Sequence, residues 1–163
     1  YCKNKRTAIQ AGGACGVWPV EMAKHFKSVF TYEPSKENYE CLVLNTSDYK
    51  NIYCDNVALG GTTGYCNVML PTSEKLNCGA YYVMPATEST KIPQIRLDDE
   101  MDKNSGPIDF IQLDVEGREY EVLLGAEQLI KYYNPVIMFE EKHLPQDKET
   151  GHIVGKTQKY LEL

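Results

Sequence analysis

Hydrophobic and polar positions alternate between two kinds of segment along most of the chain. Short, nearly continuous apolar runs at residues 7–11, 28–33 and 51–59 predict β-strands that are buried on both faces. Between these runs, apolar residues at helical spacing predict two helices, one with Pro19 in its first turn and one capped by Ser35. This alternation indicates an α/β protein with a parallel sheet covered by helices on both faces.

The middle of the chain, residues 62–106, interrupts this alternation. It is rich in Thr, Ser, Asn, Gly and Pro, and it contains strand-like pieces at residues 65–70, 80–84 and 92–97 but no helix pattern. We interpret it as a small β insertion that lies over or beside the main sheet. Two roles stay open for such a segment, shaping a substrate site or serving as a structural flap.

Regular alternation then returns. Residues 108–114 predict a strand, residues 118–132 a helix with a break at Gly125, and residues 136–140 a further strand. Right-handed crossovers place the carboxyl ends of parallel strands, and with them a ligand site, along one edge of the sheet. The length fits a single domain over residues 1–163.

Composition and charge limit the class of partner. No apolar run reaches the length of a membrane-spanning helix and none resembles a signal peptide, so we expect no membrane association and a cytoplasmic location. The net charge of -6 argues against bulk attraction to nucleic acid, whereas an acidic site would suit a cationic cofactor. The six cysteines lack metal-finger spacing, and we expect them to be reduced.

The most informative chemistry lies where the first strand ends. In the segment IQAGGACG, at residues 9–16, Gly12, Gly13 and Gly16 would let backbone N–H groups approach a ligand closely. Glu33 ends the next predicted strand, where a carboxylate can accept hydrogen bonds from ribose hydroxyls. Together these features indicate a nucleotide-binding βαβ unit and an adenosyl cofactor. The alternative is that the glycines only permit tight packing of strand and helix.

Three weaker motifs have plainer explanations. The segment GHIVGKT at residues 151–157 is one residue too short between its glycines for a phosphate loop. The acidic run at residues 98–102 has oxygen ligands for a divalent cation, but a solvated loop or a capped helix start explains it as well, and we predict no metal. Tyr65, Tyr81 and Tyr82 could stack on a sugar or pack within strands.

Seven short blocks occur in an informative order. They are IQAGGACG (9–16), FTYEP (30–34), NVALG (56–60), IRLDD (95–99), IDFIQLDVEG (108–117), LGA (124–126) and PVIMFE (135–140). In this order they resemble the FkbM-type family of S-adenosylmethionine-dependent methyltransferases. The resemblance implies a Rossmann-like class I methyltransferase fold, a three-layer sandwich with a mostly parallel sheet. It also implies S-adenosyl-L-methionine as the cofactor and S-adenosyl-L-homocysteine as the product.

The resemblance also assigns cofactor-binding residues by position. It implies that the glycines cradle the methionine part, that Glu33 holds the ribose and that residues 55–58 flank the adenine. The full set is Gln10, Gly12, Gly13, Gly16, Glu33, Pro34, Asp55, Asn56, Val57, Ala58 and Asp114. Where this chain has Gln10 the family usually has Asp. Gln10 can still hydrogen-bond the amino group of the cofactor, directly or through water, but it lacks the negative charge.

The family normally completes a seven-stranded sheet with an antiparallel pair of strands, which would follow Leu163. The resemblance therefore implies that the chain is either truncated or unusually short. An edge strand left exposed by the absence of that pair would favour a homodimer.

Methyl transfer from a sulfonium is an in-line displacement, so positioning of the acceptor is the main task of the enzyme. A base within about 2.6–3.2 Å of an acceptor hydroxyl, or one water away, should assist. The candidates stand at or just past strand ends: Asp114, Glu116, Glu140, Glu141 and His143. Each has a plainer role open to it. Asp114 could cap a helix, Glu116 could favour a helix N-terminus, and His143 could be an ordinary surface residue.

We therefore expect a methyltransferase that acts on a hydroxyl of a small molecule or glycan, an acceptor class suggested by the resemblance. A non-catalytic module that binds S-adenosylmethionine is one alternative, supported by Gln10 and by the missing strands. A nicotinamide-dependent oxidoreductase is another, although the glycine turn does not match G-x-G-x-x-G.

Overall fold

The computed structural model describes residues 2–69, 82–85, 91–101, 106–140 and 161. Its main sheet has five parallel strands in the order β3-β2-β1-β8-β9. The strands are β1 (Thr7–Ala11), β2 (Ser28–Tyr32), β3 (Ile52–Asp55), β8 (Ile108–Leu113) and β9 (Val136–Phe139). Strand order reverses between β1 and β8, and ligands of open α/β sheets bind at such a switch point.

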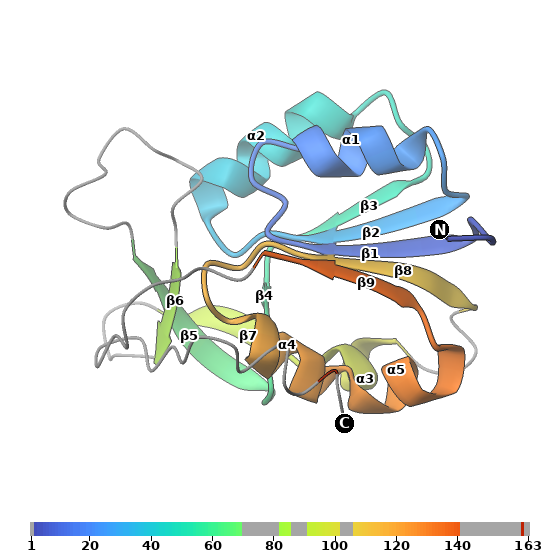
Figure 1. The fold of residues 1–163 in the computed structure, drawn as a ribbon. Helices are drawn as coiled ribbons and strands as arrows, with labels where there is room; N and C mark the ends of the chain where they lie inside the picture. Colours follow the sequence, from blue (N-terminus) through green and yellow to red (C-terminus); the bar gives the residue numbers. More distant parts are fainter. Residues whose placement is uncertain (1, 70–81, 86–90, 102–105, 141–160, 162–163) are drawn as a thin grey trace.

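Helices cover both faces of this sheet and complete three layers (Figure 1). On one face lie α1 (Val17–Ala23) and α2 (Lys36–Thr46). On the other lie α3 (Leu97–Glu100), α4 (Glu119–Gly125) and α5 (Glu127–Tyr133). Pro19 lies in the first turn of α1 and Ser35 caps α2 by accepting from the Asn38 N–H at 3.4 Å, as predicted. The expected α/β three-layer architecture is therefore confirmed.

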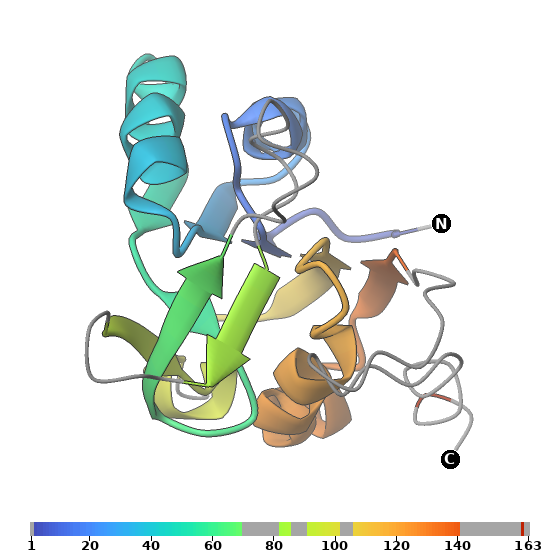
Figure 2. The same ribbon diagram turned by 90° about the vertical axis from the view of Figure 1, so that its left-hand side faces the viewer.

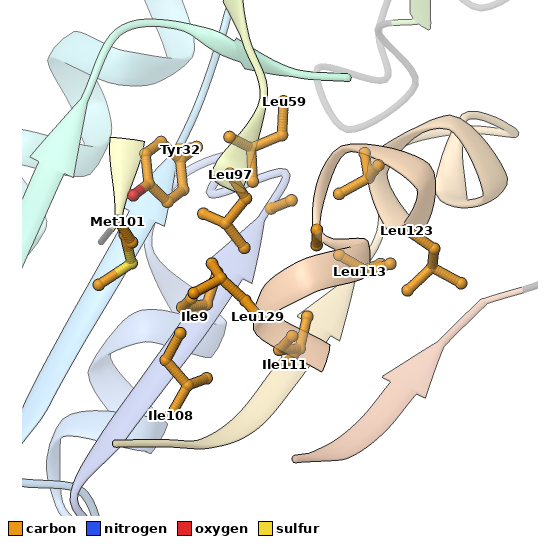
Figure 3. Close-up of a cluster of buried hydrophobic side chains, with 13 residues drawn as sticks. Ile9, Tyr32, Leu59, Leu97, Met101, Ile108, Ile111, Leu113, Leu123 and Leu129 are labelled. Atoms are coloured by element: carbon orange, nitrogen blue, oxygen red, sulfur yellow. The ribbon is translucent and has the colours of Figure 1, made fainter. Parts of the chain in front are cut away.

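The largest hydrophobic cluster lies between the main sheet and the layer of α3, α4 and α5 (Figure 3). Alternate residues of β1 and β8, including Ile9, Ile111 and Leu113, face Leu123 of α4 and Leu129 of α5. Fully burying one such side chain stabilises the fold by about 1.5–3 kcal/mol. A smaller cluster of Ala8, Met22 and Val29 lies under α1. β1 is buried along its whole length, which explains its continuous apolar run.

The strand predicted at residues 51–59 is wrong in its extent. β3 ends at Asp55, and Ala58–Leu59 forms β4, which belongs to a second sheet. The chain turns between them, where the Asn56 side-chain amide donates to the carbonyl of Glu33 at 2.8 Å. The apolar run continues through the turn because Leu59 enters the same hydrophobic cluster from the second sheet.

The predicted insertion forms this second sheet, in the order β4-β7-β5-β6. Its other strands are β5 (Gly64–Met69), β6 (Tyr82–Pro85) and β7 (Ile92–Ile95). Figures 1 and 2 place β5 and β6 at the carboxyl ends of the main-sheet strands, on the side of α4. The expected absence of helix in this part of the chain is wrong, since α3 follows β7. Four residues are too few to show a helical period.

The predicted break at Gly125 is confirmed, because α4 ends there and α5 begins at Glu127. A Cβ atom at Gly125 would lie 2.0 Å from the carbonyl oxygen of Gly60, so this glycine allows α4 to lie directly against the backbone that leaves β4. Within the described residues no helix is long and apolar enough to cross a membrane.

Replacing Gly125 with alanine is expected to lower the free energy of unfolding by about 2 kcal/mol or more, because the new methyl group must displace the backbone of Gly60. Chemical denaturation measures the change. The control is Gly64→Ala, whose Cβ would have no atom within 4 Å. Equal stability of the two variants would show that α4 and β4 are not in contact as described.

Candidate functional site

A cavity opens at the carboxyl ends of β1, β2 and β8, beside the switch point. Its empty volume, with the open mouth included, is about 630 Å³. The turn after β1, the end of β2, α2, the second sheet and the loop after β8 all contribute to its wall. The lining residues are Ala11, Gly12, Ala14, Tyr32, Glu33, Pro34, Asn38, Ala58, Leu59, Val83, Asp114, Val115 and Glu116.

Gly12 shapes the cavity through its backbone. It has φ +84°, and a Cβ atom there would lie 1.9 Å from the carbonyl oxygen of Asp114, so the turn after β1 lies directly against the end of β8. The N–H groups of Gly12 and Gly13 donate to the carbonyl of Tyr32 at 2.9 and 3.1 Å. These N–H groups therefore hold the turn to β2 and are not directed at a ligand.

Gly13 and Gly16 do not line the cavity. A Cβ at Gly13 would lie 2.8 Å from a methyl carbon of Leu42, and one at Gly16 would lie 3.3 Å from Leu42 and Thr46. Both glycines therefore let the start of α1 pack against α2. The positions of Gly13 and Gly16 are therefore explained by tight packing of the helices, whereas Gly12 borders the cavity.

Glu33 joins the glycine turn to α2 from inside the cavity wall. Its carboxylate accepts from the N–H of Ala14 and from the N–H of Ser35, each at 2.8 Å. The residue is only 4% exposed, and this burial raises the pKa of Glu33, although the two N–H groups and the Asn38 side chain oppose the shift. The structure thus places the buried carboxylate of Glu33 at the cavity wall, and its contact with a ribose stays a prediction.

Gln10 is fully buried and does not line the cavity. Its side-chain nitrogen donates to the carbonyls of Gly12 and Ala11 at 2.8 and 3.1 Å, and its side-chain oxygen accepts from the Thr31 hydroxyl. A carboxylate could not donate to these carbonyls. Gln10 therefore supports the glycine turn from beneath, and its contact with a cofactor stays a prediction.

Of the four residues predicted to flank an adenine, only Ala58 lines the cavity. Asp55 has an exposed side chain that borders a different hollow. Val57 packs against the main hydrophobic cluster. Asn56 acts on the cavity indirectly, since it holds the backbone carbonyl of Glu33.

The loop after β8 brings two of the predicted acids to the cavity. Asp114 and Glu116 both line it, and the backbone N–H of Asp114 donates to the carbonyl of Ala11 at 3.1 Å. Glu116 has φ +57°, an uncommon conformation for a residue with a side chain. The buried Glu119 supports this loop by accepting from the N–H groups of Val115 and Gly117 at 3.1 and 3.3 Å. No sequence motif marks Glu119 for this role.

Of the remaining predicted acids and bases, Glu140 alone lies in the described residues, and it stands apart from the cavity. Glu140 follows β9, is exposed and does not line it. Glu141 and His143 lie outside the described residues, as do Tyr81 and the segment 151–157. 

The acidic run at residues 98–102 has a structural role at its start. Asp98 accepts from the N–H groups of Leu129 at 3.0 Å and Gln128 at 3.1 Å, in the first turn of α5. It also forms an ion pair with Arg96. Among the described residues no group of three His, Cys, Asp or Glu side chains could hold a metal ion.

The ionisable side chains described at the first cavity are acidic. Glu33, Asp114 and Glu116 supply three carboxyl groups, and no Lys, Arg or His stands among its described lining residues. Tyr32, Leu59, Val83 and Val115 provide apolar walls that the sequence analysis missed. A cavity with these walls and carboxylates favours a ligand that carries positive charge beside apolar surface.

Solved structures of methyltransferases share the fold. The chain matches methyltransferase FkbM from Methylobacillus flagellatus KT with a TM-score of 0.62 and 19% identity, over 90% of this chain and 35% of that chain. At this identity the likeness shows the fold, and the chain spans 35% of the length of that relative.

Two further structures match less well. One is phosphoethanolamine N-methyltransferase 1 from Haemonchus contortus (TM-score 0.45, 13% identity, 92% of this chain and 26% of that chain). The other is the 23S rRNA methyltransferase ErmE (TM-score 0.30, 25% identity, 32% of this chain and 21% of that chain). Their TM-scores are too low to support an argument.

Sequence comparison gives the family. A search of curated protein sequences found no match. The family model described as "Methyltransferase FkbM domain" matches residues 16–162, which is nearly the whole chain. With the cavity at the switch point of a matching fold, the chain belongs to the FkbM family of methyltransferase domains.

Proposed function

We propose that the cavity binds S-adenosyl-L-methionine and that the protein transfers its methyl group to a hydroxyl of a small molecule or glycan. The family implies this cofactor, and the charge of the cavity supports it. The observation that carries the proposal is the set of three carboxyl groups without a basic side chain among the described lining residues, because the cofactor carries a sulfonium and an ammonium.

The residues of the cavity divide into three roles. Glu33 would accept from the ribose hydroxyls, since its carboxylate is already oriented by Ala14 and Ser35. Apolar side chains such as Leu59 and Val115 would flank the adenine and exclude water. Asp114 and Glu116 would lie toward the positively charged end.

When bound, the cofactor supplies a methyl group on a positively charged sulfur that leaves as a neutral thioether. The tasks of the protein are then to hold the acceptor in line and to receive the proton of its hydroxyl. Asp114 and Glu116 are the described acids placed to receive that proton, because both line the cavity, whereas Glu140 does not. His143 stays a prediction from the sequence.

Calorimetry and a turnover assay test this function. We expect S-adenosylmethionine to bind with one site per chain, NAD to give no heat, and a panel of hydroxyl acceptors to include one that yields S-adenosylhomocysteine. Binding of NAD in place of S-adenosylmethionine would favour an oxidoreductase. Cofactor binding without turnover on any acceptor would favour a non-catalytic module.

The pH dependence of cofactor binding follows from Glu33. Burial raises its pKa above the ordinary 4.5, and protonation turns one oxygen from an acceptor into a donor. We therefore expect affinity to fall on acidification while ordinary glutamates are still ionised. The stability that Glu33 contributes to the fold has the opposite pH dependence. It is present at low pH and is lost as the pH rises through the raised pKa of Glu33.

Titrations by calorimetry from about pH 8 to about pH 5 measure the effect. The wild type should lose affinity at a higher pH than an ordinary glutamate would cause, whereas Glu33→Gln should bind weakly with little pH dependence. Parallel pH profiles for the two proteins would show that another group controls binding.

A further inference from the structure

A second cavity adjoins the first, between the second sheet and α4. It has an empty volume of about 960 Å³ with its open mouth included. Leu59 and Val83 line both cavities, so the two meet at these side chains. In Figure 2 the strands β5 and β6 stand in front of the carboxyl ends of the main sheet, with α4 beside them.

Close backbone contacts fix the wall of this second cavity. Gly60 and Gly61 lie directly against α4, since a Cβ at Gly61 would be 3.2 Å from the carbonyl oxygen of Glu121. The Gln94 side-chain amide donates to the carbonyl of Thr62 at 2.9 Å and ties β7 to the same turn. The cavity is therefore bounded by packed elements on both sides.

Arg118, at the start of α4, gives this cavity a charge that the first one lacks. Its Nε donates to the carbonyl of Val83 at 3.1 Å, which orients the guanidinium. Its Nη1 forms an ion pair with the carboxylate of Glu121 at 3.9 Å, a separation longer than a hydrogen bond, and Glu121 also lines this cavity. Within the described part of the chain the Nη groups make no hydrogen bond to protein. A guanidinium held in this way presents a planar donor pair suited to a carboxylate or phosphate.

Two other groups near the second cavity bear on its preference for an anionic ligand. Tyr65 lines it, and the ammonium of Lys91 lies 5.9 Å from the centre of the Tyr65 ring, so a second cation stands nearby. Burial raises the pKa of the Cys66 thiol to about 11, which keeps it uncharged at neutral pH. Arg118 and Lys91 thus place positive charge at this cavity, although the chain as a whole has a net charge of -6.

We propose that the second cavity receives the methyl acceptor and that Arg118 pairs with an anionic group of that acceptor, a carboxylate or a phosphate. This inference rests on the proposed function of the first cavity. The three carboxylates of the first cavity would repel an anion. The acceptor would therefore lie with its anionic group at Arg118 and its reacting hydroxyl toward Leu59 and Val83.

Anion titrations followed by nuclear magnetic resonance test this assignment. Inorganic phosphate and, separately, acetate are added at constant ionic strength, with and without S-adenosylhomocysteine, and the amide signals of Gly60, Gly61 and Glu121 are followed. We expect saturable shifts in the wild type and an affinity about tenfold or more lower in Arg118→Gln. Tighter binding of phosphate would indicate a phosphorylated acceptor, and tighter binding of acetate an acidic one.

Two further variants keep the result clear if Arg118→Gln folds poorly. Glu121→Gln removes the nearest carboxylate and should raise anion affinity severalfold. Lys24→Gln removes an equal charge from the exposed end of α1 and should change nothing at these signals.

Shifts that do not saturate would overturn the proposal, and so would equal anion affinities in the wild type, Arg118→Gln and Glu121→Gln. Arg118 would then serve only to hold β6. Failure of S-adenosylhomocysteine to bind is a separate result that contradicts the proposed function, because the anion titrations are also read without it.

Discussion

Replacing Gly12 with alanine is expected to abolish cofactor binding and to lower the free energy of unfolding by several kcal/mol. The new methyl carbon would lie 1.9 Å from the carbonyl oxygen of Asp114, and a φ of +84° is itself unfavourable for alanine. The clash is with backbone, so no side-chain rotation relieves it. Relief requires β1 and β8 to separate where the Asp114 N–H donates to the carbonyl of Ala11.

Loss of this contact would also displace Asp114 and the end of β2, both of which line the cavity. We therefore expect at least a hundredfold loss of affinity for S-adenosylhomocysteine by calorimetry, together with a lower midpoint in urea denaturation. Gly64→Ala is the matched control, with no atom within 4 Å of its new methyl group. Wild-type binding by Gly12→Ala would contradict the position of the turn.

Replacing Glu33 with glutamine is expected to weaken cofactor binding by about two orders of magnitude. The carboxylate has two N–H donors from the protein and would accept from the ribose hydroxyls as well. Glutamine keeps one acceptor oxygen but directs its amide group at one of these N–H groups. The variant thus loses charge, an acceptor and one of the two contacts to the N–H groups of Ala14 and Ser35.

Calorimetry with S-adenosylhomocysteine measures this loss, and thermal unfolding shows whether the protein remains folded. Glu40→Gln is the control, because Glu40 lies on α2 with an exposed side chain and forms a 4.0 Å ion pair with Lys36. If Glu33→Gln unfolded at a lower temperature yet bound the cofactor as tightly as wild type, Glu33 would be a structural support alone.

The parts of the fold that sequence predicted well are those with local causes. β1 is a continuous apolar run because both of its faces are covered. Ser35 caps α2 through a contact three residues away, and Gly125 ends α4. Such signals depend on neighbouring residues, so the sequence carries them directly.

The parts that the sequence did not reveal depend on distant contacts. The sequence predicts one strand at residues 51–59, but these residues form β3 of the main sheet and β4 of the second sheet. Burial in either sheet requires apolar residues, so the sequence does not mark the boundary between the two strands. In the site, Gly13 and Gly16 pack against α2, and Gln10 supports the turn, although a motif alone assigns all three to the ligand. Val83 reaches the cavity from the insertion, and no local pattern marks it.

Calorimetric titration of the purified protein with S-adenosyl-L-methionine tests the central claim most directly. We expect saturable heat with one site per chain in the wild type, much weaker binding in Glu33→Gln, and none in Gly12→Ala. Absence of heat from folded wild-type protein, or the same affinity in all three proteins, would contradict this claim.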